Sequence, residues 1–200
     1  MTVKDVLGGL NSGAWVRAAA KDSPEISRLL RHSADICFEL NSLPPSETER
    51  RNVLLRSLLG SVGEGFIIHS PFRCDFGFNV HVGKNFIGNY NLSILDEAEV
   101  FIGDNVMIGP NCSLVTIIHA LTPAQRNDGV MTGKPIRIGN DVWIAANVVV
   151  LPGVEIGAGA VIGAGSVVVK SIPAGMLAVG NPCRPVRRIT EEDRVEILNG

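Results

Sequence analysis

The stretch that decides the fold is residues 136–168, IRIGNDVWIAANVVVLPGVEIGAGAVIGAGSVV. Aliphatic residues recur in it at every sixth position, at Ile138, Ile144, Val150, Ile156, Ile162 and Val168. A second register two positions earlier holds Ile136, Val142, Val148 and Val154 and closes on the small residues Ala160 and Ser166. Neither the helical period nor strand alternation gives a six-residue repeat. In parallel β-helices each six residues form one flat side of a triangular coil, and the recurrent aliphatic side chain points inward. The stretch therefore predicts a parallel β-helix.

The same lattice appears earlier in the chain and is interrupted once. Its earlier members are Ile102, Ile108 and Leu114. Continued across residues 115–137, the lattice positions fall on Ala120, Arg126 and Thr132, so the coil is expected to break there. Residues 119–134 contain Pro123 and the turn sequence Asn127-Asp128-Gly129, which predicts an extended loop. Long loops of repeat proteins are where function concentrates, and His119 stands at the base of this one.

The first 60 residues follow a helical period instead. Ser23-Pro24-Glu25 supplies an N-cap, a proline at the first helical position and an early acid, which predicts a helix at about 24–40. Ser46 and Glu49 have the spacing of a capping box before an apolar run that stops at Gly60, which predicts a second helix at about 47–59. We expect a helical segment at 1–60 packed on the body, a β-helix at 61–188, and a tail at 189–200 with room for a short helix.

Composition narrows the class of protein. Hydrophobic residues make up 46% of the chain and charged residues 19%, which excludes disorder, and 22 Gly with 11 Pro indicate many turns. The net charge of -2 gives no overall field for nucleic acid. No apolar run is long enough to cross a membrane, and the first residues lack a signal-peptide pattern, so a cytoplasmic location is expected. The spacing of the four cysteines fits no zinc or redox motif, so we expect them to be reduced and mostly buried.

Several longer strings resemble the maltose, galactoside and nodulation-type sugar O-acetyltransferases of the hexapeptide-repeat superfamily. The resemblance covers nearly the whole chain, and it implies a mainly β fold: a left-handed parallel β-helix with an N-terminal helical hairpin and an extended loop at 119–134. It also implies transfer of acetyl from acetyl-CoA to a sugar hydroxyl. The strings are Ser70-Pro71-Phe72-Arg73-Cys74-Asp75-Phe76-Gly77, Asn89-Tyr90-Asn91-Leu92, Ile102-Gly103-Asp104-Asn105-Val106, Gly133-Lys134-Pro135-Ile136, Asp141-Val142-Trp143-Ile144 and Gly180-Asn181-Pro182-Cys183-Arg184.

The resemblance assigns the catalytic and acceptor-binding roles. His119 matches the loop histidine that takes a proton from the acceptor hydroxyl, which then attacks the thioester directly, and an imidazole suits this role near neutral pH. Asn89 matches an asparagine whose amide holds the acceptor and the developing oxyanion. Positions matching Asp75 and Glu97, with Asp96 alongside, grip the acceptor sugar, since a carboxylate accepts hydrogen bonds from sugar hydroxyls. Met131 and Arg73 are expected to wall the same pocket.

The resemblance also implies a coenzyme A groove between two β-helices of a homotrimer. Small residues there let the pantetheine approach, Trp143 packs beside it, and basic residues hold its phosphates. The expected cofactor-binding residues are Trp143, Ala146, Ala164, Val169, Lys170, Arg184 and Arg187, with Arg188 adjacent. The chain has Ala120, Ala145 and Val169 where the family more often has proline, glycine and threonine, and Arg17-Ala18 where some members carry an acceptor-binding acid. The identity of the sugar therefore does not carry over.

Other functions are compatible with the fold. A zinc carbonic anhydrase needs three histidines around one metal; His69 and His81, two hexads apart, could share a face, but they lack the ligand spacing of that family, so no metal is expected. Two alternatives stay open: acetylation of a non-sugar acceptor such as serine or an antibiotic, and a non-catalytic β-helix scaffold that would not bind coenzyme A.

Overall fold

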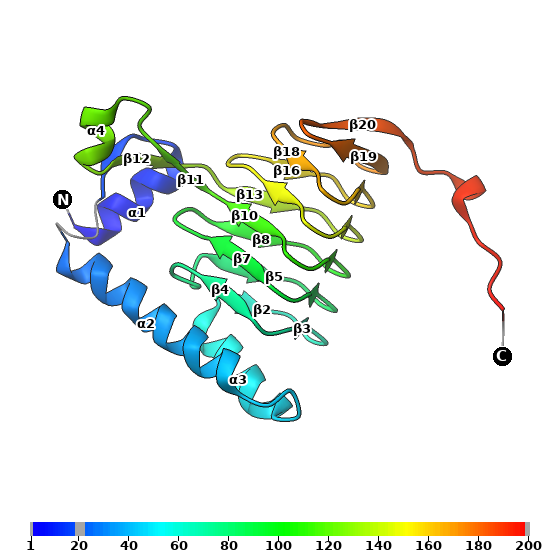
Figure 1. The fold of residues 1–200 in the computed structure, drawn as a ribbon, viewed down its shortest axis with the longest axis horizontal. Helices are drawn as coiled ribbons and strands as arrows, with labels where there is room; N and C mark the ends of the chain where they lie inside the picture. The colour runs from blue at the N-terminus through cyan, green and yellow to red at the C-terminus, as the bar shows by residue number, and fades with distance from the viewer. Residues whose placement is uncertain (1, 19–22, 199–200) are drawn as a thin grey trace.

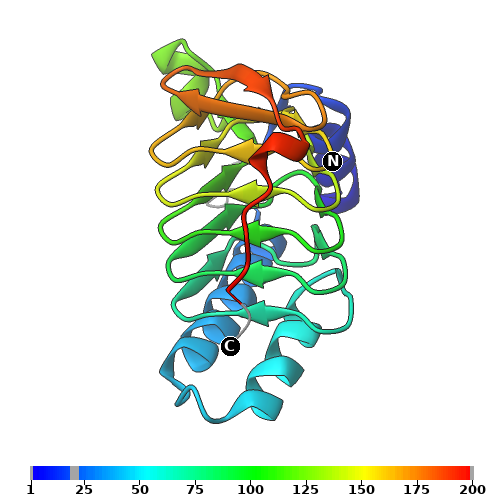
Figure 2. The same ribbon diagram turned by 90° about the vertical axis from the view of Figure 1, so that its right-hand side faces the viewer.

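The computed structural model describes residues 2–18 and 23–198. Its body is a stack of three-sided coils, with the helices along one side and the C-terminal tail leaving the last coils on the opposite side (Figure 1). Figure 2 shows the coils stacked on one another with the tail in front of them. The predicted parallel β-helix is therefore confirmed.

Three parallel faces form the body, and the chain visits them in the order face 1, face 2, face 3. Face 1 contains β2 (Ser61–Val62), β5 (Val80–Val82), β8 (Val100–Ile102), β13 (Ile136–Ile138) and β16 (Glu155–Ile156). Face 2 contains β3 (Ile67–Ile68), β6 (Ile87–Gly88), β9 (Met107–Ile108), β14 (Trp143–Ile144), β17 (Val161–Ile162), β19 (Met176–Gly180) and the antiparallel β20 (Cys183–Arg188). Face 3 contains β4 (Phe72–Cys74), β7 (Leu92–Leu95), β10 (Ser113–Val115), β15 (Val149–Val150) and β18 (Val167–Val168).

The six-residue lattice fills the interior of the stack. Both predicted registers are buried from residue 136 to residue 168, including the small side chains of Ala160 and Ser166. Equivalent positions of successive coils pair in register, as Ile102 does with Ile138 and Ile138 with Ile156. Burying one aliphatic side chain contributes roughly 1.5–3 kcal/mol, and each coil adds several. The repeat therefore specifies the fold through a continuous apolar column.

Asparagines shape the corners between faces 2 and 3. Asn91 and Asn111 have positive φ angles of 60° and 59°, a conformation that asparagine tolerates better than most residues. The Asn91 Nδ2 group donates to Asn111 Oδ1 over 2.8 Å, so the corner of one coil is hydrogen-bonded to the next. Asn91 is thus a turn residue of the coil.

Helices α2 (Pro24–Ser42) and α3 (Thr48–Leu58) cover the first coils of the solenoid, whereas α1 (Val3–Ser12) packs against residues 130–133. Leu55 and Leu58 of α3 join the solenoid core, and the buried Arg51 donates to the carbonyls of Leu40 and Ile68. The two predicted helices are confirmed within two residues at each end. The predicted capping box at Ser46 is wrong, because the helix is capped by Glu47, whose side chain makes no cap hydrogen bond. Helix α1 was not predicted.

The interruption at 119–134 is an ordered excursion from the corner between faces 3 and 1. Strand β11 (Ile117–His119) pairs antiparallel with β12 (Val130–Gly133), and the short helix α4 (Pro123–Asn127) lies at its tip. Strand β1 (Val16–Arg17) extends this small sheet on the outer side of β12. The loop predicted here is thus a β-hairpin with a helical tip. A 3-10 turn (Glu191–Asp193) follows β20 in the tail, and no helix within residues 2–18 and 23–198 is long and apolar enough to span a membrane.

Candidate active site

Asp96 organises the corner between faces 3 and 1. Its Oδ1 atom accepts the backbone N–H groups of Asp75 at 3.0 Å and Phe76 at 2.9 Å, and Asn79 donates to its carbonyl at 2.7 Å. Asp96 has no exposed surface, and burial raises the pKa of its carboxyl to about 6. The Oδ1 atom thus holds the backbone at Asp75, while the Oδ2 atom is buried and has no hydrogen-bond partner among the described residues.

Asp75 and Glu97 form a carboxyl pair beside Asp96. Burial, together with the charge of Asp75, raises the pKa of Glu97 to about 8. Burial also raises the pKa of Asp75, while a hydrogen bond from Glu97 acts in the opposite direction. Burial thus favours the neutral form of Glu97 near neutral pH. The Oε2 atom of Glu97 is buried and has no partner among the described residues.

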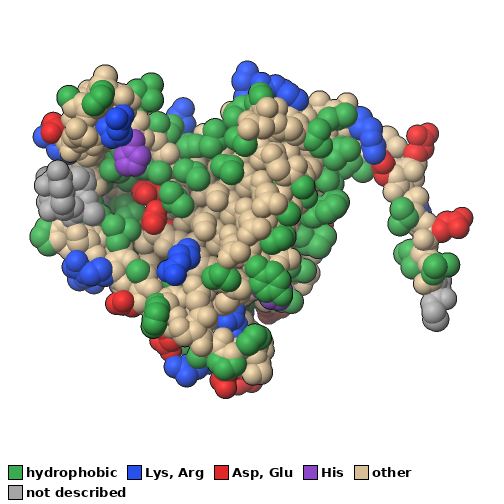
Figure 3. Space-filling view, in the orientation of Figure 1, with side chains coloured by type: hydrophobic (Ala, Val, Ile, Leu, Met, Phe, Trp, Pro, Cys, Tyr) green, Lys and Arg blue, Asp and Glu red, His purple; other side chains and the backbone are tan. Residues whose placement is uncertain are grey.

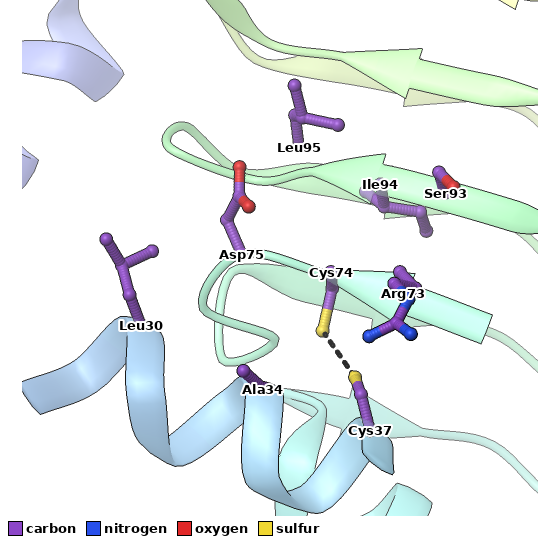
Figure 4. Close-up of a pocket in the computed structure, with 9 residues that line it drawn as sticks. All are labelled: Leu30, Ala34, Cys37, Arg73, Cys74, Asp75, Ser93, Ile94 and Leu95. Carbon is purple, nitrogen blue, oxygen red and sulfur yellow. Dashed lines mark hydrogen bonds between the residues drawn. The ribbon is translucent and has the colours of Figure 1, made fainter. Parts of the chain in front are cut away.

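Two cavities meet this carboxyl pair. The larger, of about 480 Å³, lies between α2 and the strands β4 and β7, and Asp75 and Arg73 line it (Figure 4). The smaller, of about 130 Å³, lies beneath α1 and is lined by Glu97, Met131 and Ala18. Leu30 lines both cavities. Four predicted acceptor residues therefore line two neighbouring cavities: Asp75 and Arg73 the larger, and Glu97 and Met131 the smaller.

His119 faces this region from the hairpin. It is the last residue of β11 and is paired in register with Met131 of β12. Its side chain is exposed, whereas Ala120 after it is buried and donates its N–H to the Val130 carbonyl. The space-filling view shows a hollow beneath the hairpin bordered by acidic side chains and a histidine (Figure 3). The predicted base thus lies on the same corner as the carboxyl pair.

Asn89 lies at a different corner, between faces 2 and 3. Its Oδ1 atom accepts the Tyr90 N–H over 2.8 Å, which leaves the Nδ2 group as the donor, and no further partner of that amide is found among the described residues. Ala146 and Ala164 follow β14 and β17 at this same corner, and the half-exposed Trp143 lies on β14. One chain therefore carries His119 and Asn89 at opposite ends of the strands of face 3.

The predicted phosphate-binding residues are also divided. Val169 and Lys170 follow β18 at the corner between faces 3 and 1, whereas Arg184 and Arg187 lie on β20 beside face 2. Arg187 is bound in a bidentate pair by Asp193, with N···O distances of 2.8 and 2.5 Å. Lys170 and Arg184 form no ion pair within residues 2–18 and 23–198. These two are the freer cations for a phosphate group.

Histidine spacing does not create a metal site. His69 follows β3 near the corner of faces 2 and 3, whereas His81 lies within β5 of face 1. Because a coil contains three hexads, two hexads move the chain by two faces, so His69 and His81, which the spacing allowed to share a face, lie on different faces. No group of three His, Cys, Asp or Glu side chains suited to a metal is found in the part of the chain that the structure describes.

Two family models match the chain. Residues 135–170 match the bacterial transferase hexapeptide model of six repeats, and residues 20–63 match the maltose acetyltransferase hexapeptide capping motif. The chain is 44% identical over 159 residues to a galactoside O-acetyltransferase of Escherichia coli, which covers 80% of this chain and 78% of the relative. The chain belongs to the hexapeptide-repeat O-acetyltransferases of the maltose and galactoside type. As a member of that family it is an acetyltransferase.

Further relatives agree with this membership. Nodulation protein L of Rhizobium meliloti is 43% identical over 161 residues, covering 80% of this chain and 88% of that protein. A solved galactoside acetyltransferase in complex with coenzyme A superposes with a TM-score of 0.90 at 36% identity, covering 100% of this chain and 96% of the other. Sequence reasoning had missed the two backbone N–H groups that Asp96 accepts from a neighbouring coil and the contact of Cys37 with Cys74, because both depend on packing between segments far apart in the sequence.

Proposed function

We propose that this acetyltransferase transfers the acetyl group of acetyl-CoA to a hydroxyl of a sugar, as a cytoplasmic homotrimer whose active sites lie between chains. The observation that carries the proposal is the hairpin that places His119 at the same corner of the solenoid as Asp75 and Glu97. The family relatives named for galactoside transfer, and the one solved with coenzyme A, support the acceptor and the donor.

The reaction needs a base, a place for the acceptor and a donor for the oxyanion. His119 takes the proton of the acceptor hydroxyl while its oxygen attacks the thioester carbonyl carbon. The tetrahedral oxyanion accepts a hydrogen bond from Asn89 Nδ2, which the Tyr90 N–H orients. The carbon–sulfur bond then breaks, and the leaving thiolate takes the proton from the His119 imidazolium. The proton and the acetyl group are both accounted for.

The carboxyl pair holds the acceptor. Asp75 accepts from one sugar hydroxyl, and the unpartnered Oε2 atom of Glu97 offers a second contact that the chain itself leaves open. Met131 and Arg73 wall the pocket, and Asp96 keeps Asp75 in place. A sugar presents several hydroxyls in a fixed arrangement, which suits such a pair better than a single alcohol does.

The separation of the two halves of the site supports the proposed trimer. Because His119 and Asn89 lie at opposite ends of face 3, one chain does not bring them together. A three-sided prism in a ring of three places one corner of each chain against a different corner of its neighbour. Coenzyme A would then lie between chains, against Trp143, Ala146 and Ala164, with Val169 beside it and Lys170, Arg184 and Arg187 towards its phosphates.

The test is transfer of acetyl from acetyl-CoA to a panel of galactosides, maltose, serine and chloramphenicol-like alcohols, with the product identified by mass. We expect a sugar ester. His119→Ala should lower turnover by at least about 10²-fold and leave acetyl-CoA affinity nearly unchanged. Transfer only to serine or an antibiotic would overturn the acceptor class, and full turnover by the His119 variant would overturn the assigned base.

A further inference from the structure

A pair of thiols lies between α2 and β4 and has no assigned part in acetyl transfer. Cys37 of α2 and Cys74 of β4 have their sulfur atoms 4.0 Å apart, within hydrogen-bonding distance (Figure 4). Both thiols are free, and both line the cavity of about 480 Å³ that Asp75 also lines. The other two cysteines, Cys112 and Cys183, are buried and contact no second thiol.

The fold holds these two sulfur atoms opposite each other. On one side, the Asn41 amide makes two hydrogen bonds of 2.9 Å to the backbone N–H and carbonyl of Phe72. On the other side, the Ser33 hydroxyl donates to the Phe76 carbonyl over 2.7 Å. Helix α2 is therefore fixed to the chain before and after Cys74. A sulfur pair held in this way needs to close by only about 2 Å to reach the disulfide length of about 2.05 Å.

The chemistry of the pair favours oxidation. The hydrogen bond from Cys74 lowers the pKa of the Cys37 thiol to about 7, and the charge of Arg73 acts in the same direction. Hydrogen bonding to Cys37, together with burial, raises the pKa of Cys74. One sulfur is thus partly thiolate near neutral pH while the other keeps its proton, the arrangement of an attacking and a resolving thiol.

We propose that Cys37 and Cys74 form a redox-reactive dithiol that hydrogen peroxide converts to a disulfide joining α2 to β4. The Cys37 thiolate attacks one peroxide oxygen, the O–O bond breaks, and the departing hydroxide takes a proton to become water. The sulfenic acid formed on Cys37 is then attacked by the Cys74 sulfur; its S–O bond breaks, and the leaving hydroxide takes the Cys74 proton as a second water. Two thiols lose two electrons, and the peroxide gains them.

Formation of the disulfide would affect the acceptor pocket because Cys74 directly precedes Asp75. Drawing the Cys74 sulfur toward α2 moves the strand end that carries Asp75, whose backbone N–H is held by Asp96. A misplacement of about 1 Å near reacting groups can cost up to about 10²-fold in rate. Oxidation should therefore lower kcat/KM for the acceptor by about tenfold or more and leave KM for acetyl-CoA unchanged. This second consequence rests on the proposed function; the disulfide itself does not.

The experiment exposes the whole protein to hydrogen peroxide sufficient to oxidise free cysteine completely, blocks the remaining thiols by alkylation, and maps linked peptides by mass. We expect a Cys37–Cys74 linked peptide that dithiothreitol removes. It should be absent in Cys37→Ser and Cys74→Ser and present in Cys183→Ser, which controls for loss of a buried thiol. Failure to find this peptide in the parent protein, or finding it only between chains, would overturn the dithiol.

Activity is measured on the same samples. Oxidised parent protein should lose acceptor kcat/KM and regain it with dithiothreitol, while Cys37→Ala should be unaffected by peroxide. Thermal melting of each variant without peroxide shows that it is folded. A linked protein with unchanged kcat/KM would overturn the effect on Asp75. An inactive parent protein would instead overturn the proposed function. The peptide map would still show whether the Cys37–Cys74 disulfide forms.

Discussion

Replacing Glu97 by glutamine should stabilise the protein in alkaline solution and leave it nearly unchanged in acid. In the folded chain the pKa of Glu97 is raised from 4.5 to about 8 by burial and by the neighbouring Asp75. The folded state then holds a proton that the unfolded state has released. The contribution of Glu97 to the stability of the parent protein is therefore fully present below about pH 4.5 and is lost as pH rises through about 8. Glutamine stays neutral, and its amide can still donate to Asp75.

The magnitude follows from the two pKa values. The interval from 4.5 to about 8 corresponds to about 5 kcal/mol at about 1.4 kcal/mol per pKa unit. Glu97 is partly exposed, and solvent screening reduces this figure, so we expect about 2 kcal/mol at pH 9. For a chain of 200 residues that is a rise in Tm of about 4–8 °C.

The assay is thermal melting of the parent, Glu97→Gln and Glu64→Gln at pH 5, 7 and 9. Glu64 is an exposed glutamate on a solenoid corner and serves as the matched control. The Tm difference between Glu97→Gln and the parent should be near zero at pH 5 and should grow with pH, while Glu64→Gln follows the parent. An equal Tm difference between Glu97→Gln and the parent at pH 5 and pH 9 would refute the raised pKa of Glu97. A lower Tm for Glu97→Gln than for the parent at pH 9 would refute the repulsion between Glu97 and Asp75.

Two further predictions concern the donor groove and the core. Lys170→Ala and Arg184→Ala should raise KM for acetyl-CoA with little change in kcat, and the rise in KM should be smaller at high salt. With an acetyl thioester that lacks the nucleotide, both variants should match the parent protein. A defect that persists with that thioester would exclude a phosphate contact. Ile144→Ala, at a fully buried lattice position, should lower the free energy of unfolding by about 2–5 kcal/mol in denaturant titration. The control Glu155→Ala, at an exposed position, should lower it by about 0.5 kcal/mol. Equal losses would contradict the burial of the lattice side chains inside the solenoid.

The fold could be predicted because its signal is periodic. Each aliphatic residue from Ile138 to Val168 occupies an equivalent place in the stack, so a single period determines three faces at once. The break at 119–134 could be located for the same reason, since the lattice fails at Arg126. The hairpin within this break could not be predicted, because the pairing of β11 with β12 depends on contacts that the six-residue repeat does not encode.

The site could be predicted only residue by residue. The motifs identified His119, Asn89 and the acids, but their division between two corners depends on where each turn falls in the coil. The two hydrogen bonds that Asp96 accepts come from a neighbouring coil, 21 and 20 residues away in the sequence. The Asp193 pair of Arg187 depends on the path of the tail. Such contacts are set by three-dimensional packing and leave no local pattern.

In the proposed trimer, each active site takes His119 from one chain and Asn89 from another. The most direct test of this arrangement mixes His119→Ala and Asn89→Ala, each weakly active alone, after dissociation and reassembly at equal amounts. An interface is intact when its histidine comes from one variant and its asparagine from the other, so random assembly should restore about one quarter of parent activity. No recovery, although mass measurement shows that mixed trimers have formed, would contradict the shared site, as would full activity in a stable monomer.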